Sequence, residues 1–137
     1  MTDRLKDKGE IATGTGAVGP GWGNGKAISV LFAHEGAKVF GLDIDPAAAE
    51  ETRRIVEAEG GTCAVHVADV SMGAEVDAFV KACMNTFGRV DVLVNNVGIA
   101  VVGGPPELNE ATWDQIMSVN LKSVYLQGNR TWILLDL

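Results

Sequence analysis

Residues 36–43 read Gly-Ala-Lys-Val-Phe-Gly-Leu-Asp, a glycine followed by a short β-rich run that a polar residue closes. The same unit recurs at 61–69 (Gly-Thr-Cys-Ala-Val-His-Val-Ala-Asp) and at 88–95 (Gly-Arg-Val-Asp-Val-Leu-Val-Asn). Segments of helical character separate the copies. Strands that alternate with helices of this length predict βαβ crossovers and a parallel sheet. The continuous apolar run at 92–94 is typical of a strand covered on both faces.

The segments between these strands carry helix start and stop signals. Asp45 is a predicted N-cap, with Pro46 at the first position of a helix that runs to about Glu59. Ser71 is predicted to cap the next helix. The apolar positions of that helix follow a 3.6-residue period and are Val76, Phe79, Val80, Cys83 and Phe87. Three glycines stand where a left-handed residue would end a helix, namely Gly36, Gly60 and Gly88.

Each predicted strand ends in a polar residue: Asp43, Asp69 or Asn95. Parallel strands point the same way, so these three residues would share the carboxyl edge of the sheet. Open α/β sheets bind their ligands at that edge, near the switch in strand order. Although polar residues also end strands simply as turn formers, three of them beside a glycine-rich loop favour a binding site.

The glycine-rich loop lies at residues 13–25 and precedes a helix that opens at Lys26 and runs to about His34. Backbone amides in such a turn, together with the helix N-terminus, can hold a pyrophosphate. Asp43 follows 18 residues after Gly25 and 29 after Gly14, which brackets the spacing expected for a ribose-binding acid. A carboxylate there would bind the adenosine hydroxyls and repel an extra phosphate, so NAD is the predicted cofactor.

Composition limits the remaining possibilities. The 137 residues predict a single domain, 1–137, and no apolar run approaches the roughly 20 residues of a membrane span. A net charge of −7 disfavours nucleic acid and anionic membranes as partners. The charged N-terminus lacks a secretory signal, so a cytoplasmic location is expected. Cys63 and Cys83 are expected to be buried and reduced, and no histidine or cysteine cluster has metal-ligand spacing.

Several segments together resemble the classical short-chain dehydrogenases/reductases, over nearly the whole chain up to about Gln127. The segments are Gly-Trp-Gly-Asn-Gly-Lys-Ala-Ile at 21–28, Asp43, Asp-Val at 69–70, Asn-Asn-Val-Gly at 95–98 and Ser-Val-Asn-Leu-Lys-Ser at 118–123. The Asn-Asn-x-Gly motif is far more specific than the glycines, because other Rossmann proteins do not share it.

The resemblance implies a role for each matching residue. The pyrophosphate loop is implied for Gly19, Gly21, Gly23 and Gly25, and selection of NAD for Asp43. Contact with adenine is implied for Asp69 and Val70. The segment lining the cofactor includes Asn95, Val97 and Gly98, and Asn120 resembles the asparagine of the catalytic tetrad.

Asn120 also stands out on physical grounds. Asn109 can cap a helix whose predicted buried stripe is Trp113, Ile116, Met117, Asn120 and Val124. An amide on such an apolar face must find hydrogen-bond partners or cost a few kcal/mol. A structural asparagine with satisfied hydrogen bonds is the alternative interpretation.

The sequence also departs from the family pattern. The first strand, around Gly-Glu-Ile-Ala at 9–12, is short and polar and is predicted to be a poor central strand. The glycine loop is about three residues too long, so its start could be Gly14 or Gly19. The family's catalytic serine and Tyr-x-x-x-Lys pair have no match, because the only tyrosine is Tyr125 and position 129 is asparagine. The tail at 128–137 diverges, and 130–135 could form a fifth strand or continue the helix.

The expected fold is therefore α/β, a Rossmann-type parallel sheet of order 3-2-1-4 with helices on both faces. The first functional hypothesis is an NAD(H)-dependent oxidoreductase that interconverts an alcohol and a ketone, represented here by its cofactor half. The alternatives are a non-catalytic NAD-binding or dimerisation module and a defective fragment. A homo-oligomer formed through the helices around 71–87 and 109–126 is the expected assembly.

Overall fold

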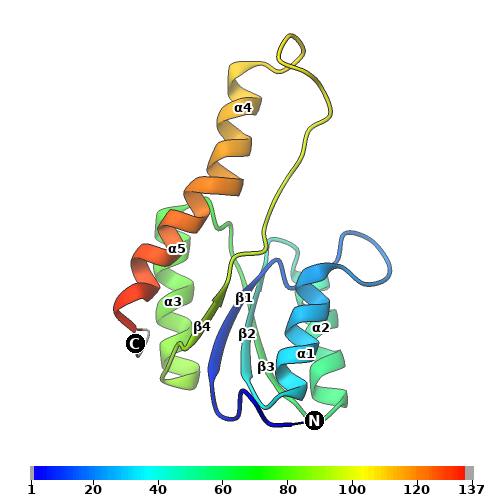
Figure 1. Ribbon diagram of the computed structural model, residues 1–137, viewed down its shortest axis with the longest axis vertical. Coiled ribbons are helices and arrows are strands. Elements are labelled where there is room, and N and C mark those ends of the chain that lie inside the picture. The colour runs from blue at the N-terminus through cyan, green and yellow to red at the C-terminus, as the bar shows by residue number, and fades with distance from the viewer. Residues whose placement is uncertain (1, 135–137) are drawn as a thin grey trace.

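The sheet has the predicted strand order. A computed structural model describes residues 2–134 and contains four parallel strands: β1 (Gly9–Thr13), β2 (Lys38–Asp43), β3 (Thr62–Val67) and β4 (Val92–Val94). Their order across the sheet is β3-β2-β1-β4, and the register aligns Ile11 with Phe40 on one side and with Leu93 on the other. The change of direction after β3 places the switch point between β1 and β4 (Figure 1).

Helices cover both faces of this sheet, as predicted. On one face lie α1 (Asn24–His34) and α2 (Pro46–Ala58), and on the other lie α3 (Gly73–Phe87) and α5 (Ser123–Thr131) (Figure 1). Each face has its own apolar cluster. Beneath α3 and α5 the cluster is built around Ile11, Leu42, Phe79 and Leu126. Beneath α1 and α2 it is smaller and is built around Ala12, Val30, Val39 and Val56.

Most of the predicted helix signals are found in the structure. The Asp45 carboxylate accepts hydrogen bonds from the Ala47 and Ala48 amides at the start of α2. The three helix-ending glycines have φ values of 90°, 82° and 74° at positions 36, 60 and 88, as a left-handed end requires.

The predicted Ser71 cap is wrong. The N-cap of α3 is Met72, which makes no side-chain hydrogen bond to the helix. The Ser71 hydroxyl instead donates to Asp69 Oδ1 at 2.6 Å, within a turn in which the Met72 amide donates to the Asp69 carbonyl. The turn places Ser71 one residue before the cap position, so its hydroxyl meets the carboxylate rather than the helix.

The expectation of a poor central strand at 9–12 is also wrong. All five residues of β1 are buried, and the strand pairs with β2 and β4. Its acidic residue, Glu10, is 0% exposed, and neither of its carboxylate oxygens has a hydrogen-bond partner among the described residues. Burial raises the pKa of Glu10 to about 8, so the side chain is mostly neutral at pH 7. Because the neutral carboxyl of Glu10 costs less to bury than a carboxylate, β1 can occupy the centre of the sheet.

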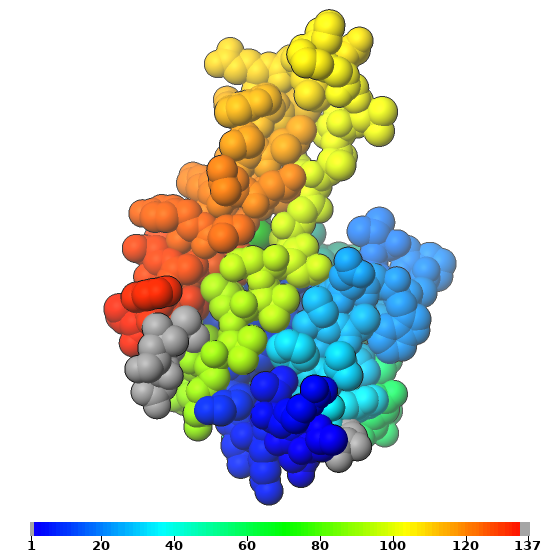
Figure 2. All heavy atoms as spheres, viewed as in Figure 1, coloured from blue at the N-terminus to red at the C-terminus, as the bar shows by residue number. Residues whose placement is uncertain are grey.

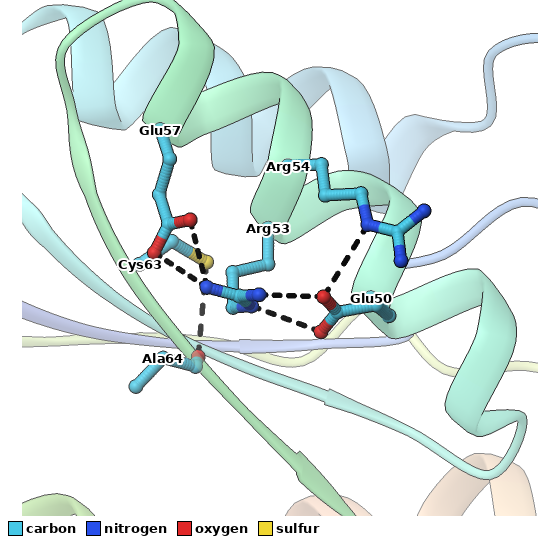
Figure 3. A network of polar contacts seen from close by, with 6 residues as sticks. All are labelled: Glu50, Arg53, Arg54, Glu57, Cys63 and Ala64. Atoms are coloured by element: carbon cyan, nitrogen blue, oxygen red, sulfur yellow. Dashed lines mark hydrogen bonds and ion pairs between the residues drawn. The ribbon is translucent and has the colours of Figure 1, made fainter.

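A network of ion pairs extends from α2 over β3 (Figure 3). Arg53 bonds to Glu50 one turn before it and to Glu57 one turn after it, and Arg54 also pairs with Glu50. These contacts lower the pKa of Glu50. Cys63 lies beneath the network; both it and Cys83 are free and buried, as expected, and burial raises the pKa of each thiol to about 12.

A projecting arm follows β4. The segment 99–109 leads outward to α4 (Glu110–Met117), which returns through a π-helical turn, Ser118–Lys122, into α5 (Figures 1 and 2). The predicted N-cap is confirmed, because Asn109 accepts a hydrogen bond from the Thr112 amide. The predicted buried stripe is wrong: α4 has no buried residue and Trp113 is 54% exposed. No described segment packs against the side of α4 that carries this predicted stripe.

The tail continues as helix. After α5 the residues Trp132–Leu134 form a 3-10 turn, so the helical alternative holds through Leu134, and position 135 lies outside the described residues. Among residues 2–134, β4 has a strand partner on one side only.

Candidate functional site

A crevice of about 630 Å³ opens at the carboxyl ends of the strands, where the sequence predicted a site. Parts of four segments line it, together with Gln115 and Val119: the glycine loop at 14–25, residues 43–48, residues 68–70 and residues 96–99. The first and second strands each end at the crevice, so the loops that follow them form two of its walls.

The ends of the glycine loop contact each other through backbone. β1 ends at Thr13, so the turn begins at Gly14, which has a φ of +64°. A Cβ at Gly14 would lie 2.9 Å from Asn96 Nδ2, and a Cβ at Gly25 would overlap the carbonyl oxygen of Gly14. A Cβ at Gly16 would overlap the side chain of Ala48. These three glycines therefore allow the loop to pack closely against its surroundings, and sequence reasoning had not singled out Gly16.

The other predicted loop glycines occupy different environments. Gly19 and Gly21 have φ values of +81° and +109° with open space around them, so they serve loop conformation rather than close packing. Gly19 and Gly23 line the crevice, as does Gly25, whereas Gly21 does not. Of the four predicted glycines, the structure thus gathers three at the crevice.

The beginning of α1 supplies backbone amides to the crevice. Gly23 is the N-cap and has no side chain with which to bond the first turn. The first backbone bond of the helix runs from the Ala27 amide to the Gly23 carbonyl, at 3.0 Å. The amides of the preceding residues, 24–26, have no intrahelical carbonyl to bond. An uncapped helix start that faces a crevice fits an anionic group such as a pyrophosphate.

Asp43 stands on the opposite wall, at the end of β2. Its Oδ2 accepts the Gly16 amide at 2.9 Å and its Oδ1 accepts the Asp45 amide at 3.0 Å. These two bonds fix the plane of the carboxylate at the crevice wall. Each oxygen keeps a lone pair, so the group could still accept hydrogen bonds from a diol.

Asp69 and Val70 line the third side of the crevice. Asp69 Oδ1 accepts both the amide and the hydroxyl of Ser71, at 2.9 and 2.6 Å. Val70 is buried and belongs to the apolar cluster beneath α3. Together they present a short wall with one polar residue and one apolar residue, a surface suited to a heterocyclic base.

After β4 it is Asn96, rather than the predicted Asn95, that lines the crevice. Its side-chain amide donates to the carbonyls of Thr13 and Gly14, at 3.1 and 3.2 Å. Its backbone amide donates to the Thr13 hydroxyl, which in turn donates to the Val94 carbonyl. Asn96 therefore fastens the ends of β1 and β4 together. The sequence offered a signal for it, because it is the second asparagine of the motif at 95–98.

The predicted Val97 and Gly98 also line the crevice, and Asn120 holds the segment that follows them. The Asn120 side chain accepts the Ile99 amide and donates to the Ile99 carbonyl, both at 2.8 Å. The amide thus has the partners it was expected to need, although it is exposed rather than buried. It belongs to the π-helical turn, a feature that often marks functional positions. Its neighbour Val119 lines the crevice.

Tyr125 lies away from this crevice. It is 66% exposed and lines a separate surface groove along the π-helical turn and α5, with Met117, Leu121 and Lys122 among its neighbours. In residues 2–134 no three His, Cys, Asp or Glu side chains are placed to hold a metal ion. Nor does any helix in that range have the length and apolarity needed to cross a membrane.

The sheet is parallel, with the order 3-2-1-4, and the crevice lies at its switch point. A glycine-rich turn and an acid after the second strand border this crevice. These features define a Rossmann-type α/β domain. The sequence profile of a family described as short chain dehydrogenase matches residues 15–130. The chain belongs to the short-chain dehydrogenase/reductase family of oxidoreductases.

Curated relatives and solved structures agree with this assignment. An uncharacterised oxidoreductase of Thermotoga maritima is 40% identical over 119 residues, which are 87% of this chain and 45% of that protein. A 2-(S)-hydroxypropyl-CoM dehydrogenase of Xanthobacter autotrophicus is 36% identical over 126 residues, which are 92% of this chain and 48% of that protein.

Among solved structures, one from Burkholderia xenovorans, described as belonging to the short-chain dehydrogenases/reductases, superposes with a TM-score of 0.92 at 42% identity. The match covers 96% of this chain and 52% of that one. A Serratia marcescens short-chain dehydrogenase/reductase variant gives 0.89 at 28% identity, with the same coverage. The chain spans about half the length of the relatives it matches.

Proposed function

We propose that this chain binds NAD(H) in the crevice and forms the cofactor half of an oxidoreductase that interconverts an alcohol and a ketone. The observation that carries the proposal is the fixed Asp43 carboxylate across the crevice from the uncapped start of α1. The helix start would receive the pyrophosphate, and Asp43 the hydroxyls of the adenosine ribose.

The preference for NAD over NADP follows from charge. A phosphate on the ribose 2′-oxygen would lie against the Asp43 carboxylate, which the Gly16 and Asp45 amides hold in place. The phosphate and the Asp43 carboxylate are both negatively charged, so they would repel each other. On the other walls, Asp69 and Val70 would contact the adenine, and Val97 and Gly98 would follow the cofactor toward the arm.

The reaction class is supported by the family and by what its named members act on. The Xanthobacter relative is named for a hydroxypropyl substrate, and another relative, from Leifsonia aquatica, is named a levodione reductase. Bound NAD supplies the hydride acceptor or donor. Asn120 would hold the Ile99 backbone and so position the segment beside the cofactor, while proton transfer needs a further side chain.

A second candidate function is an NAD-binding module without turnover. Tyr125, the tyrosine of this chain, faces a different groove, and Asn129 stands where a Tyr-x-x-x-Lys pair would place its lysine. On this view the 137 residues bind the dinucleotide but do not supply the proton relay. Assay of alcohol oxidation separates the candidates: background rates with NAD bound favour the module, and clear turnover favours the enzyme.

Location and assembly belong to the same proposal. Two free, buried cysteines favour a reducing compartment such as the cytoplasm. The exposed apolar side chains Leu121, Val124 and Tyr125 favour association through the helices around 109–126. Sedimentation of the purified chain measures the assembly, and a monomer at all concentrations would contradict it.

The cofactor proposal is tested by titrating the protein with NADH and NADPH while following nicotinamide fluorescence. Asp43→Asn keeps an oxygen for one of the two backbone amides, Gly16 or Asp45, and removes the charge, so we expect NADH to bind about tenfold more weakly. NADPH should gain relative to NADH. Glu57→Gln makes the same change in net charge on the far end of α2 and should alter neither affinity. Unchanged NADH affinity in Asp43→Asn would refute the role of Asp43.

A further inference from the structure

A buried lysine lies behind the glycine loop, outside the crevice lining. Lys26 is 1% exposed, although it carries an ammonium group. That group donates to the Gly21 carbonyl at 2.9 Å and to Glu51 Oε1 at 3.0 Å. It also lies 5.8 Å from the centre of the Trp22 ring. Lys26 therefore joins three segments that border the crevice: the loop, α1 and α2.

The glycine loop is fastened at both ends and free at its tip. At its start, Asp43 accepts the Gly16 amide and the Thr52 hydroxyl donates to the Thr15 carbonyl at 2.8 Å. At its end, the bond from Lys26 to Gly21 holds the last turn before α1. Between them the tip includes Val18, which is fully exposed.

The fastening by Lys26 and the loop conformation depend on each other. A buried ammonium is costly unless it has hydrogen-bond acceptors. If the loop swings outward, Lys26 loses the Gly21 carbonyl and keeps only Glu51, an exposed side chain. The glycine-rich chain gains conformational entropy when it opens, which favours the open state. The free-energy cost of separating the buried Lys26 ammonium from the Gly21 carbonyl opposes this opening.

We propose that Lys26 and Glu51 are positioning residues that hold the glycine loop in its dinucleotide-binding conformation. The proposal rests on the proposed NAD(H) site. Its consequence is quantitative: when only a fraction of the molecules has the closed loop, the apparent dissociation constant rises in inverse proportion to that fraction. Neither residue lines the crevice, so both act through the loop.

Four variants test the proposal. Lys26→Met keeps the buried aliphatic stem and removes both polar bonds. Glu51→Ala removes only the outer partner, on an exposed side chain whose loss leaves the core intact. Glu50→Gln is the matched control, since its side chain is the neighbour of Glu51 on α2 but pairs with Arg53 and Arg54. Lys26→Arg restores a cation at the same place.

Two readouts are measured on each variant. The first is the NADH dissociation constant. The second is acrylamide quenching of Trp22 without nucleotide, in a background in which Trp113 and Trp132 are replaced by phenylalanine. Circular dichroism is used to check that each variant is folded, so that a change in Trp22 quenching reports the loop rather than a general loss of structure.

We expect NADH affinity to fall about tenfold in Lys26→Met and about threefold in Glu51→Ala, with greater Trp22 quenching in both. Lys26→Arg should recover part of the affinity, and Glu50→Gln should match the parent. Parent-like affinity and quenching in both Lys26→Met and Glu51→Ala would overturn the proposal. If the parent itself does not bind NADH, the proposed function fails, and Trp22 quenching alone then shows whether Lys26 holds the loop.

Discussion

The sheet body and the projecting arm are stabilised in different ways. In the body, α1, α2 and α3 each bury several side chains against the sheet, and two apolar clusters fill its faces. In the arm, α4 buries none, and the pair of hydrogen bonds between Asn120 and Ile99 ties its base to the chain that leaves β4. The crevice lies where the two regions meet.

This difference shows that periodicity indicates an amphipathic helix but not its partner. The apolar stripe of α3 and that of α4 look alike in sequence, and the structure buries only the first. Burial needs a second surface at the right place. The arm positions residues beside the crevice, and the body supplies the stability.

The largest expected effect is the contrast between two aromatic residues, one in each region. Phe79 on α3 is 0% exposed, so Phe79→Ala should lower the free energy of unfolding by about 3–5 kcal/mol. Trp113 on α4 is mostly exposed, so Trp113→Ala should change it by less than about 0.5 kcal/mol. Urea denaturation measures both. Equal losses would show that the arm is packed against a surface in solution.

The next effect concerns pH and is confined to the body. The pKa of Glu10 is raised by burial from 4.5 to about 8, so the folded state binds a proton that the unfolded state has released between these values. Stability from this group is full below pH 4.5 and is lost as the pH rises toward 8. The expected loss between pH 5 and 8 is about 3 kcal/mol.

Glu10→Gln supplies the control for this pH effect, because glutamine has a similar shape and does not titrate. Its free energy of unfolding, measured in urea from pH 5 to 8, should lack the decline attributed to Glu10. A parallel decline in the parent and in Glu10→Gln would assign the pH dependence to other groups.

The smallest effect compares the two helix caps. Asp45→Ala removes the cap of α2 in the body and should lower the free energy of unfolding by about 1 kcal/mol. Asn109→Ala removes the cap of α4 and should instead appear as faster hydrogen exchange within α4, because that helix can open locally. A full loss of global stability in Asn109→Ala would mean that the arm and the body unfold together.

Much of the fold could be predicted because its signals are local. The unit of a glycine, a β-rich run and a closing polar residue occurs three times. Helix ends are also set by nearby residues: α2 begins at Asp45 and Pro46, and left-handed glycines end the helices. The candidate site followed for the same reason. Once the strands are parallel, their ends must meet at one edge.

The errors in prediction arose where distant residues decide the outcome. Nothing near Glu10 in sequence indicates that its carboxyl is buried, because β2 and β4, which pair with β1 on either side, are distant in the chain. Ser71 is an exception with a local cause, because Asp69, two residues earlier in the chain, accepts its hydroxyl in a turn. Asn96 takes the place expected for Asn95 through its bonds to Thr13, at the end of β1, and to Gly14, which lie 83 and 82 residues earlier in the chain.

The sequence by itself determined the parallel sheet and the edge that carries the crevice, because periodicity and chain direction are properties of neighbouring residues. The strand order followed from the resemblance of its motifs to the short-chain dehydrogenases/reductases. Only the tertiary structure decided which loop glycines approach the backbone, which asparagine joins two strand ends, and that Lys26 is buried behind the loop. Those outcomes depend on close contacts between segments far apart in the chain, and their distances are set by packing rather than by local preference.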